Sequence, residues 1–280
     1  MTKLPDTLPK EGTWTPLTER AVFRLTGPDR VRYLNGQVSN NVSKDLETEA
    51  IAACLCTLKG KVEALVWISS DGDSLIIDGE LSQREQLFTR LDRYLIADDC
   101  ELHDLTGEIS LIHHFSATAP GITSRRSLTK GKDLWIKKDD APPFSEDKRI
   151  TSEAFEQSQL LAKIPKAGLE ITANEFPAEL GLDSWAVDFH KGCYLGQEVI
   201  SRIESVGRAK RSLLLGTSTE PVQQHDEVIS QIEKMEVPAV TTRASIHTGK
   251  GEHLTLVLAK ISSKGTKIEE PICIRRQNEG

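Results

Sequence analysis

The sequence predicts an α+β protein in two parts, a mixed domain over residues 1–209 and a β-rich domain over residues 210–280. In the first part, strand-like and helix-like runs interleave without the regular period of about 30 residues that βαβ units show. After Gly207 the apolar runs are short and lack helical periodicity, which predicts a small all-β barrel or sandwich. A chain of 280 residues is long enough for two such domains.

A hairpin and a helix are predicted near the middle of the first part. Residues 65–81 form a β-rich run that a turn signal at residues 71–73 divides, so we expect two paired strands there. Apolar side chains at helical spacing then predict an amphipathic helix over residues 82–95. Ser82 and Glu85 have the spacing of a capping box, which places the start of this helix.

Other elements follow from similar patterns. Residues 151–165 predict a second helix that Pro165 ends. Residues 121–148 are rich in Lys, Asp, Ser and Pro and predict a loop-heavy insertion. Further strands are expected at residues 21–27, 108–117 and 132–138, and the β-type runs of the second part lie at 210–218, 226–230, 238–246, 254–261 and 267–276.

Composition argues against several classes of protein. A net charge of −7 argues against a surface that coats nucleic acid, so direct nucleic-acid binding is not expected. No run approaches the roughly 18 apolar residues of a membrane span, and the start has no signal-peptide character, which predicts a cytoplasmic protein without membrane partners. The cysteines are odd in number and lack C-x-x-C pairs, as expected for free thiols in a reducing compartment: Cys54, Cys56, Cys100, Cys193 and Cys273.

The most informative stretch is HKGCYLGQEVISR, residues 190–202. Apolar periodicity after Gly196 predicts a helix that begins near this glycine, with Val199, Ile200 and Ile203 turned inward. Cys193 then lies just before a helix N-terminus and two residues from Lys191, an environment that favours a thiolate. At this point a reactive thiol and an ordinary buried cysteine both remain open.

Two other chemistries fit the residues less well. The neighbours of Cys193 match no known pattern of a Cys-His hydrolase, and His190 is badly placed to act as its base. A metal site formed by Cys54, Cys56, Cys100 and the His113-His114 pair is weaker than a strand with two core cysteines, because C-x-C places both sulfurs on one face. The sequence therefore predicts no metal site.

Charges of opposite sign adjoin one another near this stretch. Residues 170–188 carry five carboxylates and no Lys or Arg, whereas residues 190–211 carry five basic residues against Glu198 and Glu204. A ligand with a hydrogen-bond-donating head and an anionic tail suits such a pair of segments.

The stretch KGCYLGQE resembles the K-G-C-F/Y-x-G-Q-E signature of the YgfZ family, folate-binding relatives of the glycine-cleavage T-protein. Three other segments are similar to family motifs in the same order: LTGPDRVRYLNGQVSNNV at 25–42, TLKGKVEALVWI at 57–68 and EFPAELGLD at 175–183. The resemblance spans most of residues 20–215. Ser39 and Asn41 depart from the usual Thr and Asp, and Glu204-Ser205 departs from the usual residues after the signature.

This resemblance implies a fold and a ligand. It implies two similar α/β subdomains around a central channel, closed on one side by a C-terminal β-barrel, with tetrahydrofolate or a one-carbon derivative as cofactor. The implied chemical residues are Cys193, as the functional thiol, and Lys191, which would hold the folate tail or keep the thiol ionised. Glu179 is implied as the acceptor of the pterin N–H donors. The remaining implied folate contacts are Tyr194, Gln197, Glu198, Arg202 and Arg208.

The function implied is that of an accessory protein for iron–sulfur cluster assembly or repair, which indirectly supports tRNA modification through its iron–sulfur client proteins. Two alternatives stay open: an aminomethyltransferase-type enzyme that uses folate for one-carbon transfer, and a binding module without chemistry. Cys193 alone cannot supply the usual four thiolates of a cluster, so any cluster would be shared or transient.

Overall fold

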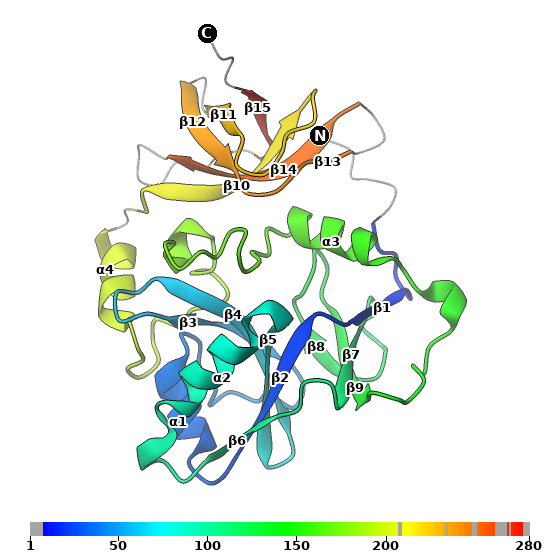
Figure 1. The fold of residues 1–280 in the computed structure, drawn as a ribbon, viewed down its shortest axis with the longest axis vertical. Helices are drawn as coiled ribbons and strands as arrows, with labels where there is room; N and C mark the ends of the chain where they lie inside the picture. The colour runs from blue at the N-terminus through cyan, green and yellow to red at the C-terminus, as the bar shows by residue number, and fades with distance from the viewer. Residues whose placement is uncertain are drawn as a thin grey trace.

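The computed structural model describes residues 8–206, 209–232, 235–247, 251–260, 268 and 270–276. Two antiparallel sheets with their helices form one part of the molecule, and a β-barrel lies above them, with helix α3 (Ser152–Leu161) between (Figure 1). The predicted fold class, α+β with a small C-terminal barrel, is confirmed. Within the described residues, no helix is both long and apolar enough to cross a membrane.

The larger sheet has five strands in the order β3-β4-β5-β2-β6. Two helices, α1 (Arg30–Gln37) and α2 (Arg84–Asp92), contribute Leu34 and Leu87 to the apolar core that the sheet residues Phe23 and Ile77 also form. The strands are β2 (Arg20–Thr26), β3 (Ile51–Cys56), β4 (Val62–Asp71), β5 (Ser74–Glu80) and β6 (Glu101–Asp104).

The predicted hairpin is confirmed. Strand β4 ends at Asp71 and β5 begins at Ser74, and these two residues pair across a two-residue turn. Gly72 in this turn has a φ of +56°, a conformation that glycine adopts without strain.

The predicted capping box is wrong, and the helix is shorter than expected. A 3₁₀ turn, η1 (Leu81–Gln83), follows β5 directly, so α2 begins only at Arg84 and no side chain caps it. The reason is that the backbone N–H of Leu81 donates to the carbonyl of Glu19, which keeps the chain beside the sheet at the position where the helix was expected. A further 3₁₀ turn, η2 (Leu95–Ala97), follows α2.

The smaller sheet has four strands in the order β1-β7-β9-β8. Residues 121–148 contain the strand expected at 132–138, which is β9, and a short strand, β8, that the sequence did not predict; the rest is irregular, as expected of a loop-heavy insertion, apart from a 3₁₀ turn, η3 (Glu146–Lys148), near its end. Helix α3 follows, capped by Thr151, whose hydroxyl accepts from the N–H of Ala154. The strands are β1 (Trp14–Leu17), β7 (Ile109–His114), β8 (Ile122–Ser124) and β9 (Gly131–Lys137).

An irregular segment with one 3₁₀ turn, η4 (Pro177–Glu179), leads to helix α4 (Gln197–Val206), and the barrel follows. The barrel closes through β10-β15-β11-β12-β14, because β14 also pairs with β10, and β13 adds to β14. Its strands are β10 (Arg211–Ser218), β11 (Glu227–Ile232), β12 (Met235–Thr241), β13 (Ile246–His247), β14 (His253–Lys260) and β15 (Ile272–Arg276).

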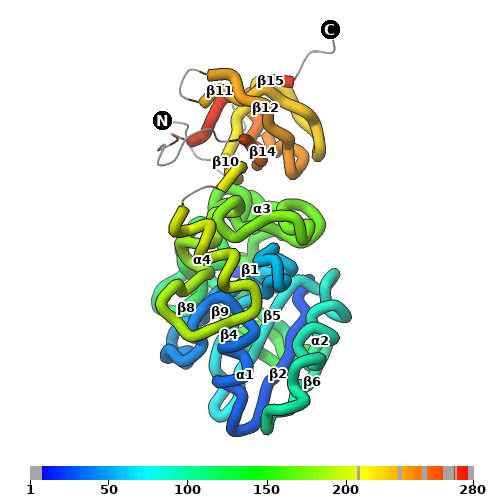
Figure 2. Tube along the Cα trace, turned by 90° about the vertical axis from the view of Figure 1, so that its left-hand side faces the viewer, coloured from blue at the N-terminus to red at the C-terminus, as the bar shows by residue number. Residues whose placement is uncertain are grey.

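The barrel packs against the rest of the chain through apolar side chains, and Figure 2 shows it next to α3. Leu215 and Leu256 of the barrel share one apolar core with Ile164, just beyond α3. Beside it, the buried guanidinium of Arg243 donates to both oxygens of Glu170, each at 2.7 Å. The domain boundary expected at 209/210 falls just before β10, and apolar packing continues across it.

Candidate functional site

Cys193 lies on an exposed loop, residues 188–196, which we call the cysteine loop and which leads into α4. All five cysteines are free thiols, and Cys54 and Cys56 are buried, whereas Cys193 is exposed. Gly196 ends the loop with a φ of +86°, and a Cβ there would lie 2.5 Å from the carbonyl oxygen of Thr57. Only glycine therefore allows the chain to turn into α4 this close to its neighbour.

Lys191 is buried beneath the cysteine loop and caps the end of α1. Its Nζ donates to the carbonyl oxygens of Asn35, Val38 and Asn40 at 2.6, 2.8 and 2.7 Å. These acceptors lie at and just beyond the C-terminus of the helix, where carbonyls lack intrahelical partners and the helix dipole favours a cation. Burial lowers the pKa of Lys191 to about 8, so the side chain is still protonated at pH 7 and has three donors for the three acceptors.

These contacts of Lys191 differ from the two roles that the resemblance implies for it. We expected its ammonium either to keep the thiol ionised or to hold the tail of folate. The structure places it against backbone carbonyls, where it fixes the position of the cysteine loop on α1.

Backbone bonds tie the same loop to the segment that follows α1. The N–H of Leu195 donates to the carbonyl of Gly36, and the N–H of Asp188 donates to that of Ser39. The hydroxyl of Ser39 donates to the carbonyl of Ala186 at 2.6 Å and accepts from the N–H of Cys54 at 2.8 Å. Ser39, at the position where the family that the motifs resemble usually has threonine, thus still supplies a hydroxyl.

A third segment, the turn between β3 and β4, packs on the start of α4. A Cβ at Gly60 would lie 3.1 to 3.3 Å from atoms of Ile200, Val199 and Gly196. The N–H of Val62, just after this turn, donates to the carbonyl of Glu175 at 2.9 Å, which ties the turn to the segment of residues 175–183. The four segments that resemble family motifs, far apart in sequence, therefore meet around the cysteine loop.

The other signature residues have separate environments. Tyr194 is buried beside Cys54 and Cys56, which raises the pKa of its hydroxyl, and that hydroxyl finds no hydrogen-bond partner among the described residues. Glu198 and Arg202, expected to contact folate, form an exposed ion pair with each other at 2.8 Å on α4. Gln197 begins α4 beside them, and Arg208 lies outside the described residues.

Glu179 is buried and already has partners within the protein. Arg211 donates to its two oxygens at 3.1 and 3.2 Å, and the N–H of Phe176 donates to one of them at 3.0 Å. The resemblance to the YgfZ family implies that Cys193 and Glu179 serve one folate site, but the groove that Glu179 lines does not have Cys193 among its described lining residues.

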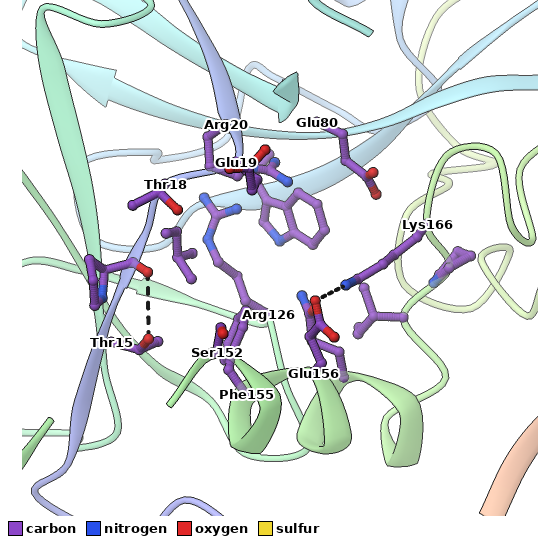
Figure 3. A pocket seen from close by; sticks show the side chains of 16 residues that line it. Thr15, Thr18, Glu19, Arg20, Glu80, Arg126, Ser152, Phe155, Glu156 and Lys166 are labelled. Atoms are coloured by element: carbon purple, nitrogen blue, oxygen red, sulfur yellow. Dashed lines mark hydrogen bonds and ion pairs between the residues drawn. The ribbon is translucent and has the colours of Figure 1, made fainter. Parts of the chain in front are cut away.

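A second pocket, here called the central pocket, lies between the two sheets and α3 and encloses about 130 Å³ (Figure 3). Trp67 lines it, with the guanidinium carbons of Arg20 and Arg126 at 5.1 and 4.7 Å from its ring. Glu80 points into the pocket opposite Lys166, which pairs with Glu156 at 3.0 Å (Figure 3).

Buried charges hold the wall of the central pocket together. Arg126 pairs with Asp78 from the larger sheet and with Asp133 from the smaller one, and Arg20 also pairs with Asp78. Burial alone would raise the pKa of Asp133, but the Arg126 charge and the hydrogen bond from His113 hold it at about 2. The network joins the two sheets directly behind the pocket.

Glu80 is the carboxylate of the central pocket that is suited to a ligand. One oxygen accepts from the N–H of Ala167 at 3.1 Å, and the other has no partner among the described residues. Burial raises the pKa of Glu80, against the lowering effects of the Ala167 hydrogen bond and of the charge on Arg20. A half-buried carboxylate beside an indole can accept from the N–H groups of a flat heterocycle.

Comparison with known proteins leads to the same family as the sequence motifs do. No model of a known protein family matches the chain. Curated relatives match over most of it: the tRNA-modifying protein YgfZ of Cronobacter sakazakii is 25% identical and covers 92% of this chain and 89% of its own length, and that of Shigella sonnei is 29% identical over 76% of each. The chain is related to the YgfZ proteins.

Two further matches extend the relationship. The mitochondrial iron-sulfur cluster assembly factor IBA57 homolog of Pyricularia oryzae is 28% identical over 72% of this chain, and the chain spans 56% of that relative's length. The glycine cleavage system aminomethyltransferase T of Bartonella henselae has the same fold, with a TM-score of 0.76, 12% identity and coverage of 91% of this chain and 80% of its own. The resemblance to the YgfZ family and the T-protein fold, both inferred from the motifs, are thus confirmed.

The central pocket of this YgfZ relative was missed from the sequence. Trp67 and Glu80 lie within runs that read correctly as strands, but nothing local distinguishes them from other strand residues. Arg126 lies in a stretch of polar residues that predicts an exposed loop, and it is buried. The signal that could have indicated a buried ion pair is the presence of Asp78 and Asp133 within runs of strand residues, with Arg126 only seven residues before Asp133.

Proposed function

We propose that this YgfZ relative is a tetrahydrofolate-binding accessory protein for iron–sulfur cluster assembly or repair, with Cys193 as its functional thiol, and that it supports tRNA modification through iron–sulfur clients. The observation that carries the proposal is the exposed Cys193 on a loop that buried Lys191 fixes to α1. The names of its relatives, an iron-sulfur cluster assembly factor and tRNA-modifying proteins, support the same role.

The position of Cys193 suits a thiol that acts on a partner. It is exposed on a loop fixed on both sides, so its sulfur can approach an atom of another protein without reorganisation of the chain. A single thiol supplies one ligand out of the usual four, and a cluster or sulfur atom held by it is therefore shared with the client.

We place the pterin ring of tetrahydrofolate in the central pocket. The indole of Trp67, with Arg20 and Arg126 against its ring, forms part of the apolar wall of the pocket, and Glu80 offers an acceptor to the N–H donors of the pterin ring. The pocket encloses about 130 Å³, less than the roughly 300–1,000 Å³ of pockets that hold whole small molecules, so we place only the ring there and the rest of the cofactor outside. Glu179, the anchor expected from the sequence, is less suited because Arg211 and Phe176 already use its oxygens.

The thiol is tested by replacement of Cys193 with Ser in cells that lack the gene. We expect the variant to fold with an unchanged melting temperature and to restore neither the activity of an iron–sulfur enzyme nor the dependent tRNA modification, because serine cannot replace a thiol as a sulfur or metal ligand. Cys273→Ser, a second exposed cysteine on the barrel, is the matched control and should restore both. Full rescue by Cys193→Ser would overturn the role of the thiol.

The cofactor site is tested by isothermal titration of tetrahydrofolate into two glutamine variants. Glu80→Gln should weaken binding about tenfold or more, because a charge-assisted hydrogen bond contributes roughly 1.5–3 kcal/mol. Glu179→Gln should leave the affinity nearly unchanged and lower the melting temperature, because Arg211 loses a charged partner. The reverse pattern would mean that Glu179, and not Glu80, binds the pterin ring. If the wild type does not bind tetrahydrofolate at all, folate is excluded as its cofactor.

The fold of the glycine cleavage aminomethyltransferase favours a second candidate, a one-carbon transfer enzyme. The exposed Cys193, part of the stretch that resembles the YgfZ signature, favours the accessory role. If the protein catalyses the glycine-cleavage exchange reaction with a lipoyl carrier protein, it is a one-carbon transfer enzyme and not an accessory protein.

A further inference from the structure

A large groove separates the barrel from the segment that carries the cysteine loop. It encloses about 950 Å³ and lies between η4, α4 and β12; we call it the barrel groove. It adjoins a smaller hollow of about 480 Å³, with which it shares Arg211, Pro238 and Lys260. The barrel groove alone reaches the upper end of the roughly 300–1,000 Å³ of small-molecule pockets, so the two together suit an extended occupant.

The lining of the barrel groove is largely apolar. Met235 is 50% exposed, and Val199 and Ile203 of α4 are half-buried, so the groove presents side chains that a partner can cover. The apolar and aromatic lining residues are Phe176, Val199, Ile203, Met235, Val237 and Pro238.

Positive charge surrounds this apolar lining although the whole chain carries −7. Lys61, Lys210 and Lys260 line the groove and form no ion pair with any described residue. The two carboxylates of the groove are already neutralised, Glu179 by Arg211 and Glu236 by Arg275 at 2.8 Å.

In the smaller hollow the charges are balanced, because Glu175 and Glu227 lie there with Arg211 and Lys260. An acidic occupant is therefore favoured in the barrel groove and not beyond it.

The barrel groove and the cysteine loop share α4. The loop enters the helix at Gln197, and Val199 and Ile203 on the same helix line the groove. Figure 2 shows α4 rising from the rest of the chain toward the barrel. An occupant of the groove thus lies within one helix length of the segment that carries Cys193.

We propose, on the basis of the accessory role above, that the barrel groove docks an acidic peptide segment of a client protein that also carries apolar side chains. The lysines would pair with its carboxylates, and α4 and β12 would cover its apolar residues. An RNA strand fits less well, because bases need free aromatic faces and Lys61 already covers the ring of Phe176 at 3.3 Å.

The test measures fluorescence anisotropy of a fluorescein-labelled peptide of alternating Glu and Leu with the full-length protein. We expect saturable binding that weakens as salt rises. A Gln–Leu peptide and a Glu–Ser peptide should each bind about tenfold more weakly, since each lacks one of the two features that the groove recognises. Equal binding of all three peptides would overturn the proposal.

Two charge-reversed variants locate the site. Lys210→Glu with Lys260→Glu should weaken binding of the Glu–Leu peptide by about tenfold. Lys137→Glu with Lys138→Glu changes the net charge equally on the exposed end of β9 and should leave binding unchanged. Equal effects of both variants would overturn the proposal, and so would labelled single-stranded RNA that binds the wild type more tightly than the peptide does.

Cys193→Ser separates this inference from the proposed function. The variant should bind the Glu–Leu peptide like the wild type and fail in cells, whereas the Lys210→Glu, Lys260→Glu variant should bind the peptide about tenfold more weakly and also fail in cells. If Cys193→Ser binds the peptide and is fully active in cells, the functional role of the thiol is refuted and the docking role of the barrel groove stands. If a variant that does not bind the peptide is fully active in cells, the docking role of the groove is refuted.

Discussion

Replacement of Lys191 with methionine is expected to destabilise the protein by about 3–5 kcal/mol, because three buried carbonyl oxygens lose the charged donor they share. Methionine keeps most of the apolar stem but offers no hydrogen to Asn35, Val38 or Asn40. The end of α1 loses its cap, and the cysteine loop loses the contact that holds it against the helix.

The free energy of unfolding in urea measures the first effect, and the rate at which Cys193 reacts with a disulfide reagent measures the second. We expect the thiol to react faster in Lys191→Met, because the loop opens more often. If Lys191 instead served to ionise the thiol, the variant would keep its stability and the thiol would react more slowly. Lys44→Met removes an exposed lysine that pairs with Asp188, at the start of the same loop, and should cost less than about 1 kcal/mol.

Where the sequence succeeded, the signal was local. The hairpin at residues 71–73 depends on turn residues that are adjacent in the chain, and the start of α4 depends on Gly196 and the apolar residues that follow it. The capping box at Ser82 failed although its signal was also local, because a bond from Leu81 to Glu19, distant in sequence, kept the chain beside the sheet.

The candidate functional site was predicted only in part, again because contacts between residues distant in sequence shape it. The signature identified Cys193, and the structure adds that the four motifs meet around it. The partners of Lys191 lie about 150 residues earlier, and the partner of Glu179 lies 32 residues later. No rule of sequence spacing connects such residues. From the sequence alone, Lys191, which caps a helix, and Glu179, which Arg211 binds, therefore both look like ligand-binding groups. Trp67, Glu80 and Arg126 become a pocket only when two sheets pack together.

Replacement of Arg126 with methionine is expected to cost about 3–5 kcal/mol at pH 7, because Asp78 and Asp133 remain buried with less positive charge beside them. The cost should depend on pH in a defined direction. In the wild type the pKa of Asp133 is held at about 2, below its ordinary value, so its contribution to stability is present above about pH 4 and is lost as the pH falls toward 2.

In Arg126→Met the effect of burial on Asp133 is opposed mainly by His113, so the pKa of its carboxyl should rise above that of the wild type. The folded variant then takes up a proton more readily than the wild type does, and the difference in unfolding free energy between the two should shrink between pH 7 and pH 4. Urea unfolding at both pH values measures this, with Asp133→Asn and the double variant completing a mutant cycle. A cost that stays the same at both pH values, with no coupling in the cycle, would mean that Arg126 stabilises the wall of the central pocket by packing on Trp67 alone.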